Sequence, residues 1–71
     1  MTFTLAHEHS LEHRIWDSDT GLYRIILYEG KYRVGYKKFP ASCNFTWRKN
    51  MRSDKLGGAV RLAEKHLQGR S

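Results

Sequence analysis

Apolar and polar residues alternate along two segments in the middle of the chain, residues 22–28 and residues 31–39. Between them, Glu29-Gly30 can form a two-residue turn, because glycine readily adopts the positive φ that such a turn requires. The turn fixes the register of the two strands, and the inward pairs it predicts are Leu27 with Tyr32, Ile25 with Val34, and Tyr23 with Tyr36. These side chains are all apolar or aromatic, so the hairpin would present one continuous core face.

A third strand is expected after the hairpin, since apolar and polar residues alternate again over residues 43–48. Consecutive strands are usually neighbours in a sheet, so this strand should pair with the second one. The apolar members would join the core face, and they are Cys43, Phe45 and Trp47. The polar members would extend the opposite face, and they are Asn44, Thr46 and Arg48.

A helix is predicted over residues 54–68. Ser53 can cap its N-terminus and Asp54 suits its first turn. One apolar stripe at helical spacing is formed by Leu56, Ala59, Val60, Ala63 and Leu67. Gly57-Gly58 weakens the first turns by roughly 1 kcal/mol per residue relative to alanine. Either a close approach of the helix to the sheet or a looser helix start would explain this glycine pair.

The N-terminal segment, residues 1–20, is poorly defined by its pattern. Residues 1–5 alternate as a strand would, and residues 12–17 fit either a strand or a short helix capped by Ser10. We favour a strand for residues 14–16. The chain of 71 residues is then one α+β domain, residues 1–71, in which residues 22–49 form the antiparallel sheet. The predicted sheet has three or four strands, and one C-terminal α-helix packs on one of its faces.

Composition supports a folded chain. The aromatic fraction is 13%, whereas disordered chains are poor in aromatic and β-branched residues. The only cysteine is Cys43, so a disulfide framework of the kind found in small secreted domains is ruled out within the chain. No apolar segment resembles a signal peptide or a membrane span. The sequence therefore predicts a cytoplasmic protein that does not associate with membranes.

Charge is distributed unevenly along the chain, whose net charge is +6. Residues 1–30 hold two arginines against five acidic residues, whereas residues 31–71 hold eleven lysines and arginines against only Asp54 and Glu64. Such asymmetry within a small domain produces a field that attracts polyanions. An ordinary solvated surface rich in lysine and arginine is the alternative interpretation.

The predicted outer face of the sheet provides a candidate nucleic-acid site. Lysine and arginine neutralise phosphates, and an aromatic side chain such as Tyr28 can stack on an unpaired base. A second basic cluster extends to the start of the helix. The candidate nucleic-acid-binding residues from both groups are Arg24, Tyr28, Lys31, Arg33, Lys37, Arg48, Lys49 and Arg52. DNA is favoured over RNA because this face is rich in arginine, which can read guanine edges.

Metal and catalytic sites are weakly supported. His7, His9 and His13 are irregularly spaced for zinc ligands, even with nearby glutamates and Cys43 as further donors, so we expect no metal site and no cofactor. Apolar alternation around Cys43 suggests a thiol in the core. Cys43 with a histidine is only a nominal nucleophile pair, and there is no phosphate-binding loop, no dinucleotide fingerprint and no nucleophile–base–orienter set, so we expect the protein not to be an enzyme.

No sequence motif identifies a family, but the order of the predicted elements carries a resemblance. The last fifty residues resemble three-stranded DNA-binding domains that end in a helix. The segments most similar in sequence are Tyr23-Arg24 and Lys31-Tyr32-Arg33-Val34. Examples of such domains are found in plant transcription factors and in the arm-binding domains of phage integrases. The resemblance implies that the sheet face contacts the DNA major groove. The alternative hypothesis is a small phage-type or bacterial accessory protein that docks on an acidic protein partner.

Overall fold

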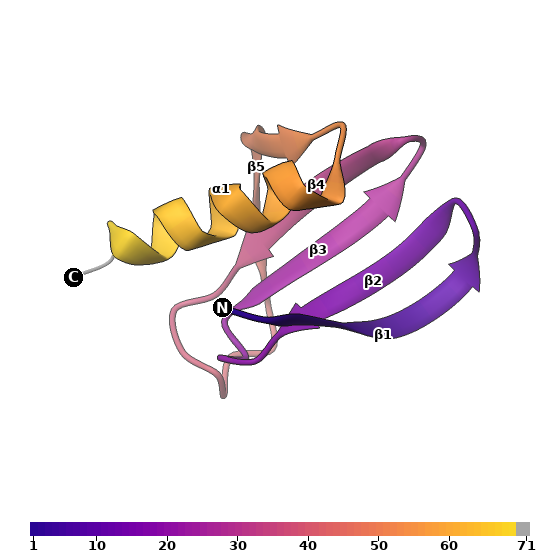
Figure 1. Cartoon of the computed structure of the whole chain (residues 1–71). Helices are drawn as coiled ribbons and strands as arrows, with labels where there is room; N and C mark the ends of the chain where they lie inside the picture. The colour runs from indigo at the N-terminus through magenta and orange to yellow at the C-terminus, as the bar shows by residue number, and fades with distance from the viewer. Residues whose placement is uncertain (70–71) are drawn as a thin grey trace.

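The computed structural model describes residues 1–69, which form a five-stranded antiparallel sheet and one C-terminal helix, an α+β fold (Figure 1). The strands lie side by side in chain order. Their bounds are β1 Phe3–Ser10, β2 His13–Ser18, β3 Tyr23–Tyr28, β4 Lys31–Tyr36 and β5 Thr46–Ser53, and the helix is α1 Leu56–Gln68. In residues 1–69 the structure has no helix with the length and hydrophobicity needed to cross a membrane.

The central hairpin has the register predicted from the sequence. Tyr23 pairs with Tyr36, Ile25 with Val34 and Leu27 with Tyr32. Both turn residues adopt positive φ, 53° at Glu29 and 76° at Gly30, as a tight turn between twisted strands requires. The expected burial follows, since Val34 is fully buried and Arg33 is exposed.

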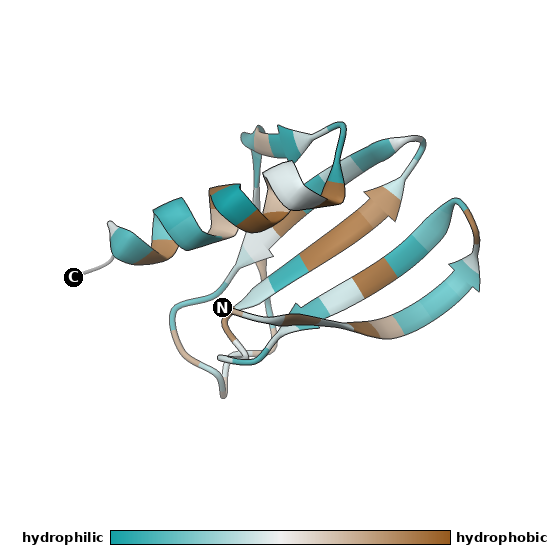
Figure 2. Cartoon of the chain, viewed as in Figure 1, coloured by the Kyte–Doolittle hydropathy of each residue, from teal (hydrophilic) through white to brown (hydrophobic). Residues whose placement is uncertain are grey.

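The core lies between α1 and the face of β3, β4 and β5 on which the helix packs (Figure 1). Tyr23, Ile25 and Val34 are its largest fully buried side chains. Burying each of them contributes roughly 1.5–3 kcal/mol of hydrophobic stabilisation. Hydrophobic residues form a continuous stretch along the middle of β3, whereas hydrophobic and hydrophilic residues alternate along the helix (Figure 2). From α1, Ala59 and Ala63 are fully buried, and their small side chains allow the helix to lie close to the sheet.

A polar contact fixes the C-terminal part of the helix above the sheet. The Tyr23 hydroxyl is hydrogen-bonded to Nδ1 of His66 over 2.7 Å. The same imidazole lies 4.2 Å from the Tyr36 ring, measured between ring centroids. A phenol carried into the core needs a hydrogen-bond partner, and His66 supplies it from the helix.

The N-terminal segment forms two strands, so the sheet is larger than the three or four strands that we predicted. β2 includes the strand expected over residues 14–16, and β1 extends well beyond residues 1–5. Apart from Phe3, every residue of β1 is exposed. Its second half, residues 7–10, is polar on both sides, which is why alternation alone did not reveal its length.

The third strand of the predicted sheet was placed wrongly. It corresponds to β5, which begins only at Thr46, and Cys43 is an exposed residue of the preceding connection and not a core thiol. Trp47 pairs with Gly35, and Thr46 pairs with Tyr36 on the core side. The sides predicted for Trp47 and Thr46 are therefore reversed. The apolar alternation had suggested that large aromatic residues face the core, but Trp47 is 43% exposed on the other side.

The helix starts later than predicted because Ser53 is the last residue of β5. The N-cap position is Lys55, without a side-chain cap, and Ser53 Oγ accepts a hydrogen bond from the Lys55 amide at 3.2 Å. A Cβ at Gly58 would meet the Ser53 side chain, whose own Cβ would lie only 3.1 Å away. Nothing lies within 4 Å of a Cβ at Gly57. The close-approach explanation thus holds for Gly58 alone.

These two glycines provide a matched stability test. We expect Gly58→Ala to lower the free energy of unfolding by about 1 kcal/mol or more, because the added methyl overpacks against Ser53. Gly57→Ala should leave it unchanged or raise it by up to about 1 kcal/mol, since alanine is the better helix former. Urea unfolding followed by circular dichroism measures both. Equal stabilisation by the two substitutions would show that the helix start does not depend on this contact.

A candidate nucleic-acid interface

The side of the sheet opposite α1 is covered by no other element of residues 1–69, and we call it the open face. Its residues follow from the strand pairing, in which members of one pair point to the same side. From β2 to β5 the open face carries Ile15, Asp17, Arg24, Ile26, Tyr28, Lys31, Arg33, Gly35, Trp47 and Arg52. It combines cations with aromatic and aliphatic side chains, whereas the opposite side is the core.

An irregularity in the pairing of β4 with β5 shapes this face. Arg33 pairs with Arg52 and Gly35 pairs with Trp47, so Val34 alone stands opposite residues 48–51. The extra residues of β5 bulge out of the ladder. Bulges of this kind bend a strand and redirect its side chains. As a result, Trp47 and Arg52 lie on the open face while Met51, between them, is buried in the core.

Trp47 rests on the bare backbone of Gly35. A Cβ at Gly35 would lie 2.8 Å from three carbons of the indole ring, closer than real Cβ contacts allow. Only glycine leaves room for the ring here, which is a known reason for a glycine inside a strand. This contact places a large, partly exposed aromatic surface in the middle of the open face.

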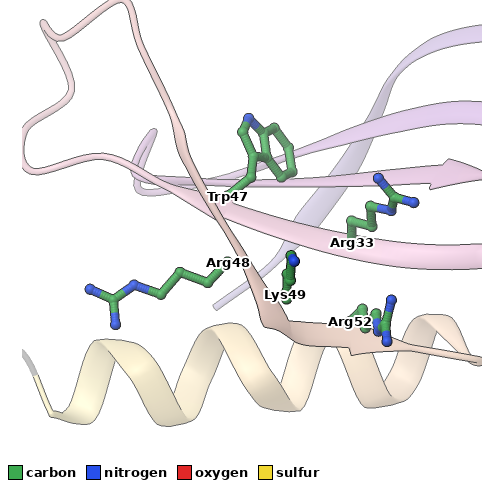
Figure 3. A pocket seen from close by; sticks show the side chains of 5 residues that line it. All are labelled: Arg33, Trp47, Arg48, Lys49 and Arg52. Carbon is green, nitrogen blue, oxygen red and sulfur yellow. The ribbon is translucent and has the colours of Figure 1, made fainter.

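Next to Trp47 the bulge forms a basic hollow of about 440 Å³. It is lined by Trp47 and four cations, Arg33, Arg48, Lys49 and Arg52 (Figure 3). Within residues 1–69 none of these four cations forms an ion pair with an acidic side chain. Like charges held together without counterions repel one another, so this hollow favours an anionic ligand.

A second hollow, of about 460 Å³, adjoins the basic one and is mainly apolar. His13, Ile26 and Tyr28 line it, together with Arg33 and Trp47, which also line the basic hollow. The His13 ring lies edge-on to the Tyr28 ring, with 5.3 Å between their centroids. We call this the aromatic hollow. The two hollows together form a continuous surface that changes from basic to apolar across Arg33 and Trp47.

Two predicted site cations on the open face are already engaged by the protein. Arg24 binds both carboxylate oxygens of Asp17, at 2.7 Å from Nε and 3.3 Å from Nη2. Lys37 donates to the Ser42 carbonyl at 2.9 Å. Both cations also lie over the Phe45 ring, 4.8 Å and 4.9 Å from its centroid. These contacts fix the long connection between β4 and β5. Arg24 and Lys37 therefore hold this connection in place.

Lys31 is likewise engaged, because it forms an ion pair with Asp54. Hydrogen bonding and attraction from Lys31, with a further contribution from Arg52, hold the pKa of the Asp54 carboxyl below its usual range. Both partners are exposed, so solvent screens the pair and its contribution to stability is small. The pair links the β3–β4 turn region to the start of the helix, beside the Arg52 end of the basic hollow.

Arg48 does not join the open face, contrary to the prediction. Its guanidinium lies 5.7 Å from the centroid of the Tyr36 ring, on the side of the sheet that carries the helix. In Figure 3 its side chain extends away from Lys49 and Arg52. It also borders a small hollow with Lys65 and His66. The reversal follows from the pairing of Thr46 with Tyr36, which puts Thr46 and Arg48 on the core side, and Arg48 contributes to the edge of the basic hollow only.

Of the predicted site residues, the structure brings Tyr28, Arg33, Arg48, Lys49 and Arg52 to the two hollows, and it adds three that were not among them. Trp47, Ile26 and His13 are the additions. A signal for Trp47 was present in Gly35, since an isolated glycine in a strand often marks the close approach of another group. For His13 there was no such signal, because residues 1–20 showed no clear pattern.

The three N-terminal histidines lie on the β1–β2 end of the sheet as a row of rings. His7 stacks on His9 with 6.1 Å between ring centroids, and His9 stacks on His13 with 4.7 Å. No group of three histidine, cysteine or acidic side chains in the described part of the chain is arranged to hold a metal ion. The row instead continues the line of rings that ends at Tyr28.

Comparison of the chain with protein-family models, curated proteins and solved structures finds no match. The open face and its two hollows are therefore the basis on which the function is inferred.

The contact between Gly35 and Trp47 can be tested directly. In Gly35→Ala the new methyl should displace the indole ring, because its Cβ would lie 2.8 Å from the ring carbons. The protein has two tryptophans, so an NMR spectrum shows two indole N–H signals, and Trp47→Phe identifies the one from Trp47. We expect Gly35→Ala to shift that signal strongly and to leave the Trp16 signal nearly in place. An unchanged Trp47 signal would mean that the ring does not rest on Gly35.

Proposed function

We propose that this protein is a small non-enzymatic nucleic-acid-binding module, which contacts the phosphate backbone through its open face. The observation that carries the proposal is the basic hollow, where Arg33, Lys49 and Arg52 surround Trp47 without an acidic residue in the lining. Phosphates are the natural ligands of such a cluster, since each contact neutralises a charge and releases counterions from the nucleic acid.

The distribution of ion pairs supports this proposal. Acidic residues engage Arg14, Arg24 and Lys31, so the chain does neutralise cations where it has carboxylates nearby. At the β5 bulge, Arg33, Lys49 and Arg52 line one hollow with Arg48 at its edge, and the lining has no carboxylate. Mutual repulsion among them opposes folding, and a bound polyanion would relieve it.

The lining of the two hollows also supports a binding role. It contains arginine, lysine, histidine, isoleucine, tyrosine and tryptophan side chains. These groups can neutralise charge and stack on rings, whereas covalent or acid–base catalysis requires a nucleophile held by a base and an orienting partner. The histidine of the lining, His13, contacts the rings of Tyr28 and His9.

The double substitution Arg33→Gln/Lys49→Gln tests the proposal. We expect it to weaken binding to labelled DNA and RNA by about tenfold or more, because a hydrogen bond to a charged group contributes roughly 1.5 kcal/mol or more. The slope of log affinity against log salt concentration should fall by about 0.9 for each lost contact on a duplex. Both side chains are exposed, so the free energy of unfolding should change by only about 0.5 kcal/mol.

The matched control is Arg61→Gln/Lys65→Gln, which removes the same charge from exposed positions of α1. It should change affinity only slightly, since general attraction falls but no contact is lost. Equal losses from the two variants would indicate nonspecific attraction and contradict a site at the bulge. Failure of the unmodified protein to bind any nucleic acid in a salt-dependent manner would favour docking on an acidic protein partner instead.

A further inference from the structure

We infer that the ligand of the open face is a single-stranded nucleic acid, with an unpaired base in the aromatic hollow and its neighbouring phosphates in the basic hollow. This inference rests on the proposed function and specifies its substrate class. Three features of the open face carry it: exposed ring faces, the adjacency of two hollows of different polarity, and the width of the sheet.

The exposed ring faces belong to Trp47 and Tyr28. They are 43% and 48% exposed, and both line the aromatic hollow. Stacking on such rings requires access to the flat face of a base. In a duplex those faces are covered by the adjacent base pairs, whereas an unpaired strand can splay its bases onto a protein surface.

The adjacency of the hollows matches the repeat of a nucleotide strand. A nucleotide carries its apolar base and its anionic phosphate on one sugar, so its binding site needs an apolar surface beside a basic one. Arg33 and Trp47 line both hollows, which places the two surfaces in contact. An arginine at this boundary can bind a phosphate with its guanidinium or stack its plane on the base.

The width of the open face argues against insertion into a duplex groove. The hollows extend from His13 of β2 to Arg52 of β5, which spans four adjacent strands. Neighbouring strands are about 4.8 Å apart, so the face measures roughly 14 Å before side chains are counted. The major groove is about 12 Å wide and admits a two-stranded ribbon. The basic hollow lies mainly on the edge strand β5, and the aromatic hollow extends from it across β4 and β3 to β2.

The test compares labelled single strands with a duplex by fluorescence anisotropy at two salt concentrations. The probes are a thymidine oligonucleotide and a uridine oligonucleotide of about 15 nucleotides each, a length close to the upper site size of single-strand-binding domains. A DNA hairpin duplex of similar length is the third probe. We expect both single strands to bind more tightly than the duplex, and the two single-strand arms show whether the 2′-hydroxyl matters.

Substitutions of the rings provide the specific readout. Trp47→Leu should weaken single-strand binding roughly 5- to 150-fold, which is the loss of one stacked base, while leaving the salt slope unchanged. Phe39→Leu is the matched control, because Phe39 is 60% exposed but lies outside both hollows. It should bind as the unmodified protein does. Tyr28→Leu gives an independent test at an exposed position, in case Trp47→Leu unfolds the domain.

The outcomes separate this inference from the proposed function. Salt-dependent binding in which the duplex is preferred, and in which Trp47→Leu and Tyr28→Leu behave like Phe39→Leu, would overturn the single-strand inference and leave the proposed function standing. Absence of salt-dependent binding to all three probes would overturn both. In the unmodified protein, a shift of the Trp47 indole N–H signal upon addition of the thymidine oligonucleotide would support base stacking, and an unchanged signal at saturation would contradict it.

Discussion

A single helix can cover only one side of a five-stranded sheet, and the organisation of this protein depends on that constraint. α1 has 13 residues and is therefore about 20 Å long. It packs on β5, β4 and β3 through buried alanines, and the hydrogen bond between Tyr23 and His66 also joins the helix to the sheet. The side chains of the sheet that form the core must then come from that one side. The other side remains in water unless a partner covers it.

On the open face, some cations are paired with carboxylates and others are not. Where carboxylates are available, cations are paired, as Arg24 is with Asp17. At the β5 bulge, cations and an indole ring are exposed together. The ring has room to lie against the neighbouring strand only because Gly35 has no side chain. A surface that was merely soluble would not require a strand glycine to seat a partly exposed tryptophan. This geometry is typical of a surface built to contact a ligand with both charge and rings.

The sequence was most informative where local chemistry fixed the geometry. Glu29-Gly30 specified the turn, the turn specified the register, and the inward pairs of β3 and β4 followed. The prediction failed on β5 because the aromatic members of residues 43–48 were assumed to face the core, and the bulge then changes the phase of the strand beyond them. Trp47 and Met51 are four residues apart and would share a side in a regular strand, yet one is on the open face and the other is in the core. A bulge has no sequence pattern strong enough to reveal this change of phase.

The candidate site was therefore only partly predictable. Arg33 and Tyr28 were placed correctly, because they belong to the hairpin whose register was known. Trp47 was assigned to the core because the apolar members of the alternation were expected there, and its neighbour Arg48 was therefore assigned to the wrong side as well. His13 is the first residue of β2 and was missed because residues 1–20 showed no clear pattern. Its neighbour strand β1 is exposed on both sides and gave no amphipathic pattern that would place the two strands.

The order of the strands has a consequence for how the sheet forms. Every strand pairs with its neighbour in the chain, through connections at residues 11–12, 19–22 and 29–30 up to β4, and through the longer connection at residues 37–45 before β5. Closing a longer loop carries a larger entropic cost, so the pairing of β4 with β5 has the least local advantage. The irregular ladder at the bulge reduces the number of hydrogen bonds that hold it. We therefore expect β5 to join the sheet late in folding and to open first in the native state, so that the proposed binding surface lies partly on the strand that is held least firmly.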